Sequence, residues 1–270
     1  MKILIGTAGI PGSAEERSTP AGIRRVKELG LQSMEVEFVR GVNMKPGLAR
    51  EAGKVASELG IRLSVHAPYY INLCNPEKAK DSQKRIIDSC YRGHLMGSEV
   101  IVFHPGYYGS LEKEEAFDMV GEACREMADV IEENEWKVKL GLESTGKVSQ
   151  FGTVDEILGI CKRNKLCIPV IDWAHLFAKY QGKLDFKSIL SKVISAGYDR
   201  LHTHFSNIDF TEKGERRHLT LESKQPDFKD VAKIVLKSSL KEINIISESP
   251  DIEGDALVMK GVFEKLGHKF

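Results

Sequence analysis

The chain has 270 residues, and 39 lysine and arginine residues balance 39 aspartate and glutamate residues, so its formal net charge is zero. A neutral chain has no overall attraction to nucleic acid or to a membrane, so a phosphate-binding face must come from a local patch or from bound metal ions. Five cysteines without a C-x-x-C pair, an N-terminal run too short for a signal peptide and no apolar segment of membrane length are typical of a cytoplasmic protein with reduced thiols.

Short apolar runs alternate with segments of helical period along the chain. Eight runs predict strands, at residues 2–6, 34–39, 61–66, 99–104, 138–143, 167–172, 200–205 and 242–248. Several helical segments between them end in glycine, which favours the left-handed C-cap of a helix. A strand followed by a helix, eight times over, predicts a single-domain α/β fold across residues 1–270, a (β/α)8 TIM barrel with its site at the carboxyl ends of the strands. Nothing in the sequence indicates an obligate protein partner.

Histidines and carboxylates end six consecutive predicted strands. These residues are His66, His104, Glu143, Asp172, His202 or His204, and Glu248. One strand-end histidine alone is more often a hydrogen-bonded core residue. Carboxylates that converge on one barrel mouth, however, would repel each other unless divalent cations neutralise them. The pattern therefore predicts a site with more than one metal ion, and ligands without thiolate favour zinc, manganese or iron over calcium.

Two choices stay open at the level of single residues. His202 and His204 share one face of a strand, because side chains alternate with a period of two, so the pattern does not say which of them is the ligand. Glu215 and His218 follow the seventh predicted strand, where a charged surface turn and a pair of metal ligands explain them equally well.

Aromatic and basic residues also lie in loops on the predicted rim of the barrel. Tyr69 and Tyr70 follow His66, and adjacent tyrosines there would either stack on a base or sugar or pack as part of a lid. The basic residues of the loops after the second and seventh predicted strands are Arg40, Lys45, Arg216, Arg217 and Lys224. Each is explained as solvated loop charge, and together they are only suggestive of phosphate contact.

Six motifs follow one another on successive strands: SVHAPYYINL, VFHPG, LGLEST, VIDWAHLFA, HTHFSN with GERRH, and ISESP. With these motifs the chain resembles, along nearly its whole length, the endonuclease IV family of apurinic/apyrimidinic endonucleases within the wider xylose isomerase-like barrels. The resemblance implies a metal-dependent phosphodiesterase of DNA repair that cuts double-stranded DNA on the 5′ side of an abasic site. It also implies two or three zinc ions, with manganese as the alternative metal.

The resemblance further assigns roles to single residues. Glu143 would bridge the first two ions and act as the catalytic carboxylate, and Tyr69 would contact the DNA at the lesion. The other ligands would be His66 and His104 for the first ion, Asp172, His204 and Glu248 for the second, and His175 for the third.

The chain departs from the family in two places. The third metal site of the family takes an aspartate and a histidine two residues apart. Strict alignment here offers Glu215 and Arg217, and His218 lies one residue further on. The loop that the family uses on DNA after the second strand is not recognisable in VRGVNMKPG. The third ion is therefore the weakest part of the implied site.

Sugar isomerases and epimerases of the same superfamily give the alternative function. They resemble the chain at Glu143, Asp172, His204 and Glu248, which would hold a single metal ion while the two glutamates move a proton beside a carbonyl. The imidazoles of the implied first site favour the nuclease. The neutral net charge and the imperfect third site favour the sugar enzyme. Metal identity, the lesion or sugar accepted and the oligomeric state do not follow from the sequence.

Overall fold

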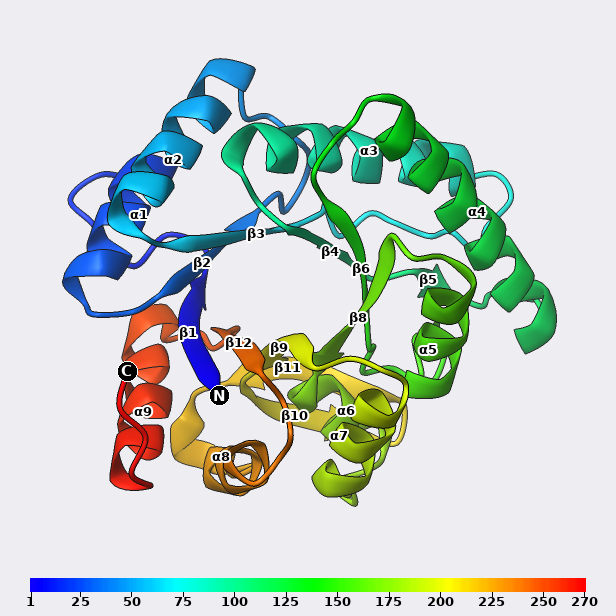
Figure 1. Cartoon of the computed structure of the whole chain (residues 1–270). Coiled ribbons are helices and arrows are strands. Elements are labelled where there is room, and N and C mark those ends of the chain that lie inside the picture. The colour runs from blue at the N-terminus through cyan, green and yellow to red at the C-terminus, as the bar shows by residue number, and fades with distance from the viewer. The chain divides into compact units, whose positions relative to one another are not determined.

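The computed structural model describes residues 1–270, in which eight parallel strands form a closed barrel in the order β1–β12–β9–β8–β6–β4–β3–β2 (Figure 1). The strands are β1 (Lys2–Ala8), β2 (Ser33–Glu37), β3 (Arg62–His66), β4 (Val100–Phe103), β6 (Lys139–Glu143), β8 (Cys167–Asp172), β9 (Arg200–Phe205) and β12 (Glu242–Ser247). All eight predicted strands are present, and the predicted α/β TIM barrel is confirmed.

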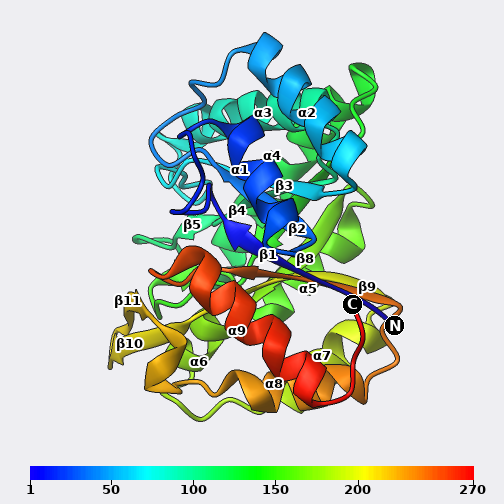
Figure 2. The ribbon, with the colours of Figure 1, turned by 90° about the vertical axis from the view of Figure 1, so that its left-hand side faces the viewer.

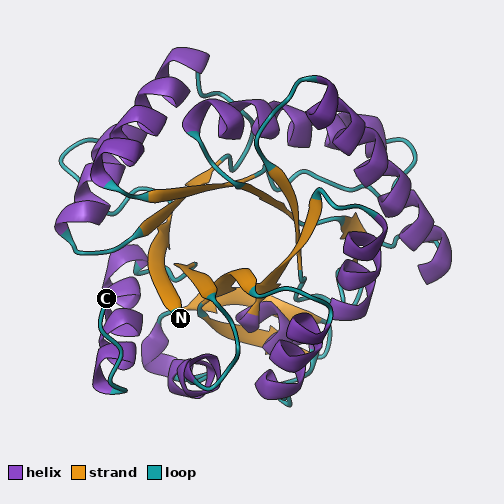
Figure 3. Ribbon diagram, in the orientation of Figure 1, coloured by secondary structure: helices purple, strands orange, loops and turns teal.

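Helices connect the strands (Figure 3). They are α1 (Thr19–Glu28), α2 (Pro46–Leu59), α3 (Ala79–Met96), α4 (Lys113–Glu133), α5 (Val154–Arg163), α6 (Trp173–Lys179), α7 (Phe186–Ser195), α8 (Phe228–Leu236) and α9 (Ile252–Lys265), with a 3-10 turn at Leu221–Ser223. Gly60 and Gly97 end α2 and α3 with φ of 67° and 69°, a conformation that glycine adopts without steric cost. None of the helices combines the length and the apolar character needed to cross a membrane.

Two small antiparallel sheets lie outside the barrel, and the sequence did not predict them. The pair β5 (Gly106–Tyr107) and β7 (Gln150–Phe151) is one of them. The other is a hairpin of β10 (Asn207–Thr211) and β11 (Gly214–Leu219), which lies beside α6 in Figure 2. The segment that holds Glu215 and His218 is therefore regular structure, and its side chains have fixed directions.

Contacts divide the chain into two compact units. The first unit contains residues Met1–Met34, Gly146–Val148 and Ile171–Phe270, and the second contains Glu35–Thr145 and Ser149–Val170. Large apolar side chains are fully buried in each unit, such as Trp173 in the first and Phe103 in the second. That residues 1–270 act as a single domain stays a prediction. Each unit holds its own group of buried histidines and carboxylates.

Candidate metal centre

In the second unit, two imidazoles face one carboxylate. Nε2 of His66 lies 3.1 Å from Oε2 of Glu143, and Nε2 of His104 lies 2.7 Å from the same oxygen. Glu143 is completely buried. The other ring nitrogen of His66, Nδ1, lies 2.8 Å from the carbonyl oxygen of Ala67. In the neutral form of His66, Nδ1 would donate to this carbonyl and the lone pair of Nε2 would be left for a cation.

Strand register explains why these residues meet. Phe103 of β4 pairs with Leu142 of β6, so the next residues along the two strands, His104 and Glu143, are neighbours. Both follow apolar positions of buried strands, and parallel strands end on the same side of a sheet. A one-residue change of register would turn one of the two side chains to the other face.

The same unit holds two carboxylates that the sequence analysis missed. Glu35 is completely buried and Glu37 is half-buried, and both lie on β2. The N–H of Phe38 donates to the carbonyl oxygen of His66 at 3.0 Å, so Glu37 and His66 are neighbours on adjacent strands. The alternating pattern of MEVEFV was the available signal. It went unused because the strand was predicted to end at Val39, whereas it ends at Glu37.

The charges in this group are not balanced by its own side chains. Burial is the largest influence on the pKa of His66 and lowers it, but the hydrogen bond with Glu143 and the charges of Glu37, Glu143 and Glu35 outweigh burial and raise the pKa to about 10. An imidazole pKa this high means that the surrounding carboxylates carry excess negative charge. A divalent cation would supply the opposite charge.

In the first unit, Asp172 and His175 are placed together by a helix cap. Oδ1 of Asp172 accepts a hydrogen bond of 2.7 Å from the backbone N–H of His175, which makes Asp172 the N-cap of α6. Its second oxygen, Oδ2, lies 3.4 Å from Nδ1 of His175. Both side chains are at most 2% exposed. One carboxylate oxygen of Asp172 thus caps the helix, and the other faces the imidazole of His175.

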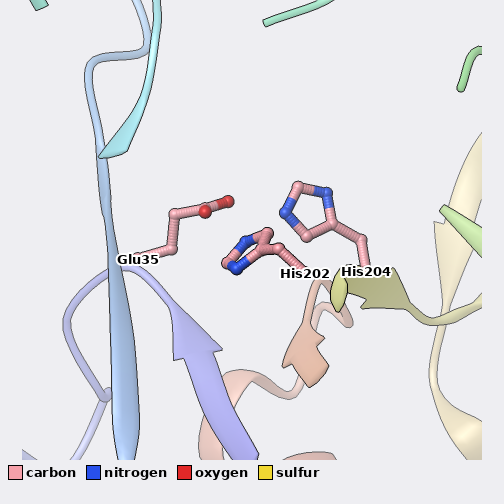
Figure 4. A group of neighbouring side chains, drawn as sticks. All are labelled: Glu35, His202 and His204. Atoms are coloured by element: carbon pink, nitrogen blue, oxygen red, sulfur yellow. The ribbon is translucent and has the colours of Figure 1, made fainter. Parts of the chain in front are cut away.

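A second group in this unit joins Asp172, His204 and Glu248, which offer ligand atoms within 4.8 Å of one another. Nδ1 of His204 lies 3.1 Å from Oε1 of Glu248. His202 projects from the same side of β9 (Figure 4), but its Nδ1 lies 3.1 Å from the side-chain nitrogen of Asn244. Ser33 in turn donates to Asn244 Oδ1 at 2.6 Å. Of the two histidines, His204 is the one beside both carboxylates.

A third group is built on the β10–β11 hairpin. Nε2 of His175 lies 3.4 Å from Oε2 of Glu215, and the rings of His175 and His218 are 5.4 Å apart. His218, His175 and Glu248 also have ligand atoms within 4.8 Å of one another. The hydroxyl of Ser206 lies 2.7 Å from Nδ1 of His218.

A bulge in the hairpin explains how Glu215 and His218 reach the same imidazole. Asp209 pairs with Arg217, but the next residue, Phe210, pairs with Glu215, so Arg216 is an extra residue in β11. Side chains three positions apart on a regular strand point to opposite faces, and one bulged residue brings them back to the same face. Arg217 instead points toward Asp209, with 3.6 Å between Arg217 Nε and Asp209 Oδ2.

The rim residues singled out in the sequence are exposed. Tyr69 is 58% exposed, and its ring lies 5.6 Å from the ring of His66. Arg216 forms an ion pair of 3.4 Å with Asp209. Arg40 and Lys45 are exposed in the second unit, and Lys224 is exposed in the first.

The chemistry of the donors fits divalent metal ions. Every member of the three groups offers imidazole nitrogen or carboxylate oxygen, and the five cysteines are buried free thiols outside these groups. Donors of this kind suit zinc or manganese. Buried carboxylates in such numbers are stable only when paired or bound to cations. The chain is therefore built to bind metal.

Comparison with known proteins agrees with this fold. The family model described as xylose isomerase-like TIM barrel matches residues 23–262. An uncharacterized protein of Methanocaldococcus jannaschii is 35% identical over 98% of this chain and 98% of its own length. A probable endonuclease 4 of Mycoplasma mobile is 27% identical over 75% of this chain and 74% of its own length.

Two solved structures of different enzyme classes are about equally similar. Endonuclease IV from Thermus thermophilus has a TM-score of 0.76 at 17% identity and covers 98% of this chain and 100% of its own. A D-tagatose 3-epimerase-like protein has a TM-score of 0.75 at 20% identity and covers 98% of this chain and 96% of its own. At such identities the likeness shows the fold alone, and the site must decide between the two activities.

Proposed function

This chain belongs to the xylose isomerase-like TIM barrel family, and on that premise we propose that it is a metal-dependent phosphodiesterase that cuts double-stranded DNA at abasic sites. The coarser description, a metal-binding enzyme of this family, follows from the family match and the buried histidine–glutamate groups. The more specific assignment, cleavage of DNA at abasic sites, rests on the number and kind of metal-ligand atoms that the chain offers. A cytoplasmic location is part of the proposal.

The observation that carries the proposal is the group of His66, His104 and Glu143 in the second unit. The single-metal alternative needs only a glutamate, an aspartate, a histidine and a second glutamate. The second unit adds two imidazoles on one buried carboxylate, and the first unit alone has two groups of donors, which exceed the about four protein ligands that one zinc ion takes. Metal ions bound by the groups of each unit explain all of these side chains, and one-metal proton transfer leaves most of them without a role.

In this proposal each group holds one ion. The groups are His66 and His104 with Glu143, then Asp172 and His204 with Glu248, then His175 and His218 with Glu215. Bound cations would lower the pKa of a water molecule and neutralise charge on the phosphate. Both effects favour phosphodiester hydrolysis. Glu143, held between two imidazoles, would orient the attacking water. Tyr69 would contact the sugar–phosphate backbone at the lesion.

The bulge in β11 supports the third ion in particular. The resemblance calls for an acidic residue and a histidine two residues apart, and this chain spaces Glu215 and His218 three apart. Because Arg216 is the extra residue of the bulge, the two side chains are separated by the equivalent of two residues of regular strand. The departure in sequence is thus compensated in the hairpin.

A sugar isomerase or epimerase is the second candidate. The similarity to the D-tagatose 3-epimerase-like protein and the zero net charge of the chain favour it. In that case a buried glutamate such as Glu143 would transfer a proton beside a carbonyl.

An incision assay separates the two candidates. The purified protein, loaded with zinc or manganese, should cleave a labelled duplex with one abasic site and leave the matched intact duplex uncut. A panel of ketohexoses, followed by chromatography, should show no interconversion. Epimerisation without incision would replace the nuclease with the sugar enzyme.

A further inference from the structure

The first turn of α9 holds a buried carboxylate that belongs to none of the groups that could hold a metal ion. This residue is Asp255, which is 4% exposed and lies four residues after Asp251, the N-cap of the helix. A buried carboxylate is stable only when it is hydrogen-bonded or paired with a cation. The partners of Asp255 therefore indicate its role.

One oxygen of Asp255 joins two segments of the first unit. Oδ2 accepts a hydrogen bond of 2.9 Å from the backbone N–H of Leu221 and a second one from the hydroxyl of Ser249. Leu221 begins the 3-10 turn after the β10–β11 hairpin, and Ser249 lies two residues beyond the end of β12. The carboxylate thus fixes the chain after the hairpin against the chain after β12.

Both of these segments carry candidate metal ligands. His218 lies three residues before Leu221, and Glu248 lies directly before Ser249. His218 and Glu248 belong to one group whose ligand atoms lie within 4.8 Å of one another. Asp255 therefore holds the backbone beside two members of that group.

The relative position of these two ligands is critical for an ion between them. Oε2 of Glu248 lies 4.0 Å from Nδ1 of His218, and Oε1 of the same carboxylate lies 3.1 Å from Nδ1 of His204. Ligand atoms bound to a zinc ion lie about 2 Å from it. The group thus tolerates only small shifts of the backbone that carries His218 and Glu248.

We propose that Asp255 is a positioning residue for the ion that His175 and His218 would bind next to Glu248. Its carboxylate holds the backbone of the ligands and does not contact the ion itself. Groups that orient metal ligands in this indirect way are typical of protein metal sites. The inference rests on the proposed metal-dependent function and names the support of one of its ion sites.

The neighbouring Glu253 provides a matched control, because it makes the same kind of contact with a different loop. It lies in the same turn of α9, and its carboxylate accepts hydrogen bonds of 2.8 Å from the backbone N–H groups of Gly12 and Ser13. These two residues follow β1, in a loop without candidate metal ligands. Comparing Asp255→Ala with Glu253→Ala therefore separates the positioning of ligands from general support of the fold.

Zinc titration of chelated and desalted variants, with a chromophoric chelator as competitor, measures the affinity for each ion. We expect Asp255→Ala to weaken the binding of one ion by about 10- to 100-fold and to bind the other ions within a few-fold of the wild type. Asp255→Asn should keep the wild-type affinity, because both hydrogen bonds go to one oxygen and an amide oxygen can accept both. Glu253→Ala should bind every ion like the wild type.

Two further variants identify the ion and guard against a folding defect. His218→Ala should lose the same ion, so adding Asp255→Ala to it should not change the affinity for the remaining ions. Ser249→Ala removes one of the two hydrogen bonds and should weaken the same ion by a smaller factor. Equal losses in Asp255→Ala and Glu253→Ala would overturn the positioning role. So would wild-type affinity for every ion in Asp255→Ala, or in Ser249→Ala where Asp255→Ala does not fold.

The same measurements distinguish this inference from the proposed function. If the wild type cuts abasic duplex and Asp255→Ala binds zinc like the wild type, the positioning role is wrong and the nuclease stands. If Asp255→Ala weakens one ion but the wild type cuts no abasic duplex, the nuclease is wrong and the positioning role stands.

Discussion

Glu143→Gln should lower the rate of incision by about two to four orders of magnitude, the usual effect of losing a carboxylate that positions or accepts a proton. The substitution keeps the size of a side chain that is completely buried. It replaces the charged oxygen that lies 2.7 Å from His104 and 3.1 Å from His66 with a neutral amide. Single-turnover incision of an abasic duplex at saturating metal measures the loss.

A matched control comes from the same unit. Glu156 is a partly buried glutamate that accepts hydrogen bonds from Tyr108 and Thr153 and lies outside the metal-binding groups. Glu156→Gln should incise at a rate within a few-fold of the wild type. Circular dichroism should show both variants folded. Normal incision by Glu143→Gln would remove this residue from the mechanism.

His218→Ala should remove one metal ion per chain and slow incision, whereas Arg217→Ala should do neither. The reason is the β11 bulge, which directs His218 toward His175 and leaves Arg217 beside Asp209. Loss even of a group that only orients a metal ligand typically costs about 10- to 100-fold in metal affinity or activity, and loss of a ligand should cost at least as much. Titration of each chelated and desalted variant with zinc, followed by a binding-site count, makes the comparison.

The two variants are matched in position, because Arg217 and His218 are adjacent residues of one strand. They differ in solvent exposure, which is 70% for the Arg217 side chain and 28% for the His218 side chain. If Arg217→Ala lost an ion and His218→Ala kept it, the hairpin would be aligned without the bulge, and the strict sequence spacing would be the correct one.

Strand ends were the part of the site most open to prediction. Parallel strands that alternate with helices end on one side of the sheet, so His66, His104 and Glu143 could be grouped from the sequence before any coordinates. In the structure these three side chains lie together, because strand register is set by buried apolar residues such as Phe103 and Leu142.

Features that depend on local hydrogen bonding were not predictable in the same way. The sequence did not choose between His202 and His204, since both share a strand face. In the structure the side-chain nitrogen of Asn244, whose oxygen accepts a hydrogen bond from Ser33, lies beside Nδ1 of His202. Glu35 was missed because strand boundaries are uncertain by a few residues from sequence alone. The bulge at Arg216 arises from the pairing of β10 with β11. The charged pattern EKGERRH gives no signal for this pairing.

The most direct test of the proposed metal sites is the number of ions bound to the wild-type chain. Protein purified without chelator and analysed by inductively coupled plasma mass spectrometry, with the protein concentration set by amino-acid analysis, should contain two or three zinc or manganese ions per chain. A single ion per chain, or none after incubation with either metal, would contradict the account.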